Sequence, residues 1–143
     1  MKFLDSLQSL MLLLLRAALG LIFLTHGYPK LAGSGPAMQP FFVQHGLPGW
    51  FVYLAGVIEF FGGGLLVLGL FTRGAAFYLT AEMGVAIWKV HLAKGYLAVH
   101  DYEFPLVLAA ACLALTSIGA GALSLDRAIF GGKSRTSRSS KKV

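Results

Sequence analysis

Three ionisable residues lie inside long apolar stretches, where they could bind and transfer protons. Arg16, Glu59 and Glu82 each fall seven to ten residues into a different stretch. At the centre of a bilayer such a residue costs about 2.5 to 3.5 kcal/mol on insertion scales, so the three are expected to face one another or a hydrated cavity. One cation cannot balance two carboxylates, and we therefore expect Glu82 to bind and release a proton. The sequence predicts a catalytic cluster of Arg16, Glu59 and Glu82; the plainer alternative is an Arg16–Glu59 ion pair that fixes the helix register.

A second set of polar residues is predicted nearer to one membrane surface. Steps of three and four residues place Lys30 on the helical face of Arg16, and His26 lies on the adjoining edge. Lys89 and Glu103 fall at the same end of the later apolar stretches. A quinone head group requires donors for two carbonyl oxygens, apolar and aromatic walls, and a source of protons. We therefore predict that His26, Lys30, Lys89 and Glu103 bind a quinone.

The histidines allow two other interpretations. His26 and His91 fall near the same ends of two helices and could hold a haem between them, although histidines at helix ends are more often hydrogen-bonded at the interface. A metal could be bound near the start of the last apolar stretch, but the spacing matches no compact ligand motif, so no metal is predicted. The residues concerned are His91, His100, Asp101 and Glu103.

The rest of the chain contains no redox motif. Cys112 is the only cysteine, which excludes an intramolecular disulfide, a CxxC pair and covalent haem attachment. There is also no glycine-rich phosphate loop after a strand, and no flavin motif. Any redox reaction would therefore require a partner protein as electron donor.

The composition is that of a membrane protein. Of 143 residues, 57% are hydrophobic and 13% are charged, and the mean hydropathy is +0.73; a soluble domain of this size could not bury so much apolar side chain. Residues 1–126 contain six basic and six acidic groups, so the net charge of +6 belongs to residues 127–143. This tail has no periodic apolar face. We expect it to be disordered and to contact anionic lipid rather than nucleic acid.

Four stretches are long enough to cross a bilayer as helices of about 30 Å. They cover residues 7–28, 50–70, 75–94 and 103–123. Because backbone groups in lipid must be bonded within their own segment, residues 1–126 are predicted to form an all-α, integral membrane four-helix bundle. Lysines and arginines number eight on the side of both termini and three opposite, which places both termini in the cytoplasm. The linker at residues 31–49 is expected to cap the bundle at the interface.

Glycines recur at helical spacing in the first two predicted spans. Gly20 and Gly27 fall in the first, and Gly56 and Gly63 flank Glu59 in the second. Small residues at this spacing favour close packing of helices. Because Gly56 and Gly63 share the face of Glu59, the same packing would turn this carboxylate inward.

The order of these motifs resembles the DoxX family of small four-helix bacterial membrane proteins. The resemblance covers about residues 10–127 and includes Arg16, LGLIFLTHGYPKL, IEFFGGGLLVLGLFTRGAA, AEMGVAIWKVH and GAGALSLD. It implies a four-helix fold in the bacterial inner membrane and association with quinone-linked oxidoreductases, because relatives include the large subunit of an archaeal thiosulfate:quinone oxidoreductase and mycobacterial members linked to oxidative-stress complexes. Thiosulfate oxidation is not implied, since no residue here identifies a sulfur site. The positions that match the family's polar signature are Arg16, His26, Lys30, Glu59, Arg73 and Asp126.

Together these features predict a quinone-associated subunit or component of a membrane oxidoreductase, and they leave open whether the chain is itself an enzyme. Its expected partners are the lipid bilayer and other membrane or redox subunits. Two alternatives stay open. One is a non-catalytic accessory subunit that docks through exposed glycine faces, and the other is a small proton-coupled transporter that uses the same carboxylates.

Overall fold

The computed structural model describes residues 2–92, 95 and 97–131, and every regular element in these residues is helical. In chain order the elements are α1 (Lys2–Leu31), α2 (Gly35–Gln44), α3 (Phe51–Leu68), α4 (Thr72–Ala86), the π-helix η1 (Ile87–His91), α5 (Val99–Ile118) and α6 (Leu125–Phe130). The all-α prediction is confirmed. Lys94 and the predicted tail from residue 132 onward lie outside the described residues.

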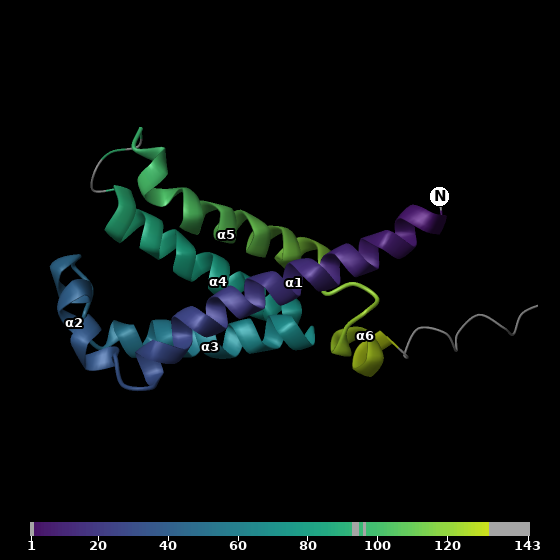
Figure 1. The fold of residues 1–143 in the computed structure, drawn as a ribbon, viewed down its shortest axis with the longest axis horizontal. Coiled ribbons are helices and arrows are strands. Elements are labelled where there is room, and N and C mark those ends of the chain that lie inside the picture. The colour runs from purple at the N-terminus through teal and green to yellow at the C-terminus, as the bar shows by residue number, and fades with distance from the viewer. Residues whose placement is uncertain (1, 93–94, 96, 132–143) are drawn as a thin grey trace, which may run out of the picture.

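The long helices form two packed pairs. α1 lies along α3, and α4 lies along α5, while contacts between α3 and α4 join the pairs (Figure 1). Their shared core includes Leu19, Phe23, Leu66, Leu79 and Leu115, each at most 4% exposed. All four long helices contribute to this core, so they enclose a common interior.

Three of the described helices, α1, α3 and α5, are long and apolar enough to cross a membrane. α4 has 15 residues, which is short for a span on its own. It continues directly into η1, and the two elements together cover residues 72–91, about 30 Å at a rise near 1.5 Å per residue. The predicted third span therefore corresponds to two consecutive elements, because the helix widens to π geometry at residue 87.

Glycines bring α1 and α3 into backbone contact. A Cβ atom added to Gly63 would lie 2.7 Å from the carbonyl oxygen of Gly20 and 2.9 Å from the amide nitrogen of Leu24. One added to Gly27 would lie 2.9 Å from the carbonyl oxygen of Gly56. The predicted packing through small residues is confirmed. Because these four glycines are covered within the chain, they do not form the docking faces expected of an accessory subunit.

Substitution of Gly63 with alanine is expected to destabilise the protein by about 1 to 3 kcal/mol, because the added methyl group must push α1 away from α3. The midpoint of thermal unfolding in mild detergent measures the loss. Gly84→Ala is the matched control, since no other atom would lie within 4 Å of a Cβ added there on α4. Equal losses in the two variants would contradict the close approach of α1 to α3.

The two ends of the bundle carry different short helices. The N-terminus and α6 lie at one end, and α2 lies at the other (Figure 1). α6 begins after Ser124, whose hydroxyl accepts a hydrogen bond from the amide of Arg127 at 3.2 Å, and it extends past the predicted start of the tail at residue 127. α2 forms within the linker expected to cap the bundle. Pro36 in its first turn supplies a helical φ angle without the loss of a hydrogen bond.

Candidate functional site

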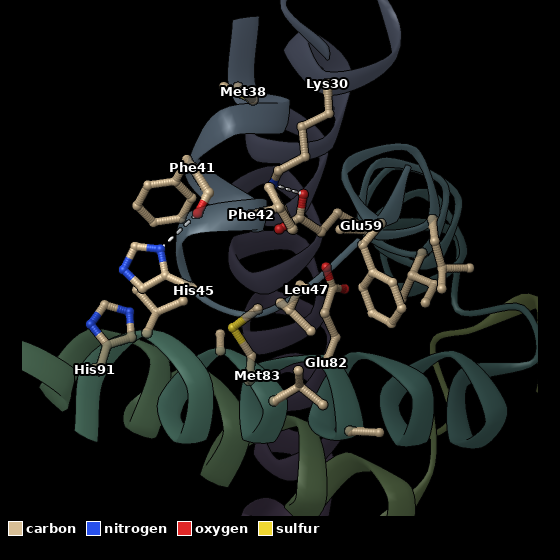
Figure 2. Close-up of a pocket in the computed structure, with 18 of the residues that line it drawn as sticks. Lys30, Met38, Phe41, Phe42, His45, Leu47, Glu59, Glu82, Met83 and His91 are labelled. Carbon is tan, nitrogen blue, oxygen red and sulfur yellow. Dashed lines mark hydrogen bonds and ion pairs between the residues drawn. The ribbon is translucent and has the colours of Figure 1, made fainter. Parts of the chain in front are cut away.

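A cavity of about 680 Å³ lies between α2, α3, α4 and η1, and the end of α1 closes one side. Its walls are mostly apolar and include Met38, Phe41, Phe42, Leu47 and Met83 (Figure 2). Sites for small organic molecules usually have volumes of about 300 to 1,000 Å³ and walls of this kind. The cavity can therefore hold a ring-sized ligand.

Lys30 and Glu59 form an ion pair at the wall of this cavity (Figure 2). Their side chains are 15% and 7% exposed. Gly56 leaves the space that the pair needs, because a Cβ atom there would lie 2.9 Å from the Cβ atom of Lys30. Lys30 can thus lie against α3 and reach Glu59, which follows Gly56 by three residues and shares its face. The prediction that Glu59 turns inward is confirmed, since the residue is 5% exposed.

Glu82 extends from α4 toward the Lys30–Glu59 pair (Figure 2) and interacts electrostatically with both residues. Its Oε2 atom is buried and has no hydrogen-bond partner in the described part of the chain. Leaving a buried polar atom unpaired costs about 1 to 3 kcal/mol. A ligand or a water molecule in the cavity could supply the missing partner.

Two histidines, His45 and His91, also line the cavity. His45 follows α2, and its Nδ1 atom lies 2.7 Å from the carbonyl oxygen of Phe41. A carbonyl only accepts hydrogen bonds, so in the neutral ring Nδ1 carries the proton and Nε2 is free to accept one. The sequence reasoning missed His45 and the α2 residues because the linker is rich in proline and glycine. A signal was present: Pro36 in a first helical turn, with Phe41 and His45 four residues apart.

Arg16 lies elsewhere in the structure. It is fully buried and donates a hydrogen bond to the carbonyl oxygen of Leu123. Its guanidinium group packs against Gly69, at the end of α3, and interacts electrostatically with Asp126. Gly69 is ten residues beyond Glu59, about 15 Å along a helix.

The predicted convergence of Arg16 with Glu59 and Glu82, and the Arg16–Glu59 ion pair, are therefore wrong. The reason is the antiparallel register of α1 and α3. Gly27 contacts Gly56 and Gly20 contacts Gly63, so each step inward along α1 from Lys30 leads away from Glu59. Counting residues from the ends of the apolar stretches misjudged the register, which the glycine contacts determine.

Arg16 instead lies beside a polar junction near α6 that is built around Asp126. The Asp126 carboxylate accepts hydrogen bonds from the amides of Phe71, at 2.7 Å, and Thr72, at 3.0 Å. The Asp126 amide donates to the carbonyl oxygen of Gly69 at 2.9 Å. Phe71 has a φ angle of 48°, which is unfavourable for a residue other than glycine. The junction therefore holds a strained turn and places a carboxylate at the start of α4, where the helix dipole favours negative charge.

The other predicted quinone ligands lie outside the cavity. His26 is exposed, and its ring centroid is 6.0 Å from that of Phe104. The amine of Lys89 lies 4.3 Å from the centroid of the Trp88 ring. Glu103 is exposed and lies 3.2 Å from the Nδ1 atom of His100. Of the seven predicted site residues, the structure brings together Lys30, Glu59 and Glu82. Within the described ranges, no three His, Cys, Asp or Glu side chains gather as metal ligands would.

Comparison with known proteins places this chain in a family. Residues 11–92 match the DoxX family model. The chain is 38% identical over 121 residues to the Bacillus subtilis (strain 168) protein named "Putative oxidoreductase CatD", which covers 85% of this chain and 88% of that protein. It is 32% identical over 129 residues to Escherichia coli (strain K12) inner membrane protein YphA, with 84% and 91% of the two chains covered. With inner membrane protein YqjF of the same strain it is 28% identical over 125 residues, covering 85% and 93%.

The comparison with solved structures gave no match. The family match spans more than half of this chain, and the Bacillus subtilis protein aligns over most of its length. The chain is therefore a membrane protein with helical spans, and it belongs to the DoxX family.

Proposed function

We propose that this chain binds a quinone in the cavity beneath α2 and acts as a quinone-associated subunit or component of a membrane oxidoreductase. One observation carries the proposal. The cavity has apolar and aromatic walls, and its charged residues are Lys30, Glu59 and Glu82. The Bacillus subtilis relative named as an oxidoreductase supports a redox role.

The residues present fit a quinone head group. The Lys30 amine has three N–H donors and shares one hydrogen bond with Glu59, so a further donor is available to a quinone carbonyl oxygen. Glu82 has a buried oxygen with no partner among the residues that the structure describes, and it could donate when protonated. A bound quinone supplies two-electron redox chemistry; Lys30, Glu59 and Glu82 would orient its head group and hold protons. Electrons would pass to or from a partner subunit.

We further propose that four helical segments cross the bacterial inner membrane, with both termini in the cytoplasm. α1, α3 and α5 would each form one span, and α4 together with η1 would form the other. Support comes from the common end of the N-terminus and α6 (Figure 1) and from the basic residues counted on that side. The two Escherichia coli relatives are named as inner membrane proteins. In this orientation α2 lies at the outer interface.

The proposal is tested by extracting lipids from protein purified in mild detergent and by titrating the protein with a short-chain quinone. The wild type is expected to yield bound quinone and to bind the added quinone. The double variant Lys30→Met/Glu59→Gln should bind it at least about tenfold more weakly, because one lost hydrogen bond in a buried site is worth about 1.4 kcal/mol. This variant removes both partners of the ion pair, so neither of them is left as an unpaired buried charge.

The matched control is Lys89→Met/Glu103→Gln, which makes the same chemical changes outside the cavity. Its quinone affinity should equal that of the wild type. No quinone in the extract, together with equal affinities in the two double variants, would contradict the proposal. A stoichiometric co-purifying protein would then favour an accessory subunit, and proton flux without quinone would favour a carrier.

A further inference from the structure

The charged and titratable side chains that line the cavity come from every element around it. They are Lys30 of α1, His45 after α2, Glu59 of α3, Tyr78 and Glu82 of α4, and His91 of η1. Lys30 and Glu59 are already paired with each other. Glu82 has an oxygen that lacks a partner among the described residues. Glu82 is therefore the carboxyl group that can still form a hydrogen bond inside the cavity.

The two histidines lie toward the end of the bundle that α2 covers. His91 follows Glu82 by nine residues on one continuous helical segment, about 13 Å along its axis. His45 and His91 are each partly exposed, whereas Glu59 is buried. Figure 2 shows both imidazoles on the same side of the cavity, with Met83 and Leu47 between them and Glu82. Both partly exposed histidines thus lie across Met83 and Leu47 from Glu82, at the end of the cavity beside α2.

We propose that His45 is the group that exchanges protons between Glu82 and the aqueous face beside α2, with His91 on the same route. The purpose of this exchange rests on the proposed function, because a quinone that gains or loses electrons also gains or loses protons. His45 would thus connect the site to solvent on the side of the membrane where α2 lies.

The chemistry of His45 follows from its hydrogen bond to Phe41. Because Nδ1 donates to the carbonyl oxygen of Phe41, Nε2 is the basic nitrogen of the neutral ring. In the exchange step the O–H bond of the Glu82 carboxyl group breaks and an N–H bond forms at Nε2 of His45, which yields a carboxylate and an imidazolium. Because Met83 and Leu47 lie between the two groups, the transfer requires water that enters the cavity and connects the carboxyl group to the imidazole. The imidazolium then releases the proton to solvent and Nε2 becomes free again.

The test follows the carboxyl group of Glu82 directly by infrared spectroscopy of the full-length protein in detergent. Glu82→Gln identifies its carbonyl stretching band by removing it. After transfer to D2O, the shift of this band reports the rate of proton exchange. His45→Gln is expected to slow the exchange at least about tenfold, as loss of a general acid–base group does. His26→Gln is the control, because His26 lies outside the cavity, and it should leave the rate unchanged.

Chemical rescue separates a proton-transfer role from a structural one. In His45→Ala, added imidazole should restore most of the exchange rate, because the cavity of about 680 Å³ admits the free ring. The proposal is overturned if His45→Gln exchanges as fast as the wild type, if imidazole fails to restore His45→Ala, or if Glu82→Gln removes no carboxyl band. Since no quinone is needed for this measurement, failure of the quinone titration would refute the proposed function without affecting the exchange result.

Discussion

Replacement of Lys30 with methionine is expected to destabilise the protein by about 3 to 5 kcal/mol, the usual cost when one partner of a buried ion pair is removed. The Glu59 carboxylate, whose side chain is 7% exposed, would lose its cation. Methionine keeps most of the apolar stem, so the loss reports the charge and not the packing. Thermal unfolding in mild detergent measures the effect.

A second substitution distinguishes the ion pair from a general loss of structure. Adding Glu59→Gln to Lys30→Met should recover most of the lost stability, since Glu59 is then no longer an unpaired buried charge. Lys89→Met serves as the control, because the amine of Lys89 lies over the Trp88 ring and makes no ion pair that the structure records; its cost should stay within about 1 kcal/mol. If Lys30→Met were as mild as Lys89→Met, Glu59 would not depend on Lys30.

Arg16→Met is the second substitution with a large expected effect, about 1.5 to 3 kcal/mol, the usual contribution of a hydrogen bond made by a charged group. It removes the donor to Leu123 and leaves the Asp126 carboxylate without its nearby cation. The polar junction should loosen, because the strained turn at Phe71 is held by Asp126. We expect faster amide hydrogen exchange at Thr72 and at Asp126, together with the lower unfolding midpoint.

The double variant Arg16→Met/Asp126→Asn measures the coupling between the two residues. Groups in one polar network typically show an interaction energy of about 0.5 to 3 kcal/mol, so the combined loss should be smaller than the sum of the single losses. Arg73→Met, at an exposed arginine of α4, is the control and should change stability by about 0.5 kcal/mol or less. Additive losses would show that Arg16 does not act on Asp126.

The fold class and three of the residues that line the cavity could be predicted from the sequence. These residues are Lys30, Glu59 and Glu82. The length of the apolar stretches predicts helices, and glycine spacing predicts the tight contact of α1 with α3. The cost of charge in lipid identifies Glu59 and Glu82 as inward residues. These inferences succeed because each depends on a local pattern and a strong physical penalty. Lys30 is predicted as a quinone ligand near one membrane surface, and the structure places it at the cavity wall, paired with Glu59.

The prediction about Arg16 was wrong because it depends on the register between helices. Arg16 was assigned to the carboxylates because it falls at a similar count from the end of an apolar stretch. A shift of a few residues along an antiparallel pair changes which side chains meet, and the glycine contacts decide it. The residues of α2 were missed for another reason: their apolar side chains become a wall only when the linker folds back over α3 and α4.

Photoreactive quinone labelling in native membranes, followed by mass spectrometry of the full-length protein, tests directly whether the cavity is a quinone site. We predict labels on cavity residues of α2 and α4, such as Met38, Phe42 and Met83. An excess of unmodified quinone should suppress these labels, and the double variant Lys30→Met/Glu59→Gln should reduce them. Labels confined to outward-facing residues such as Phe61 and Phe77, unaffected by competitor, would contradict the proposed site.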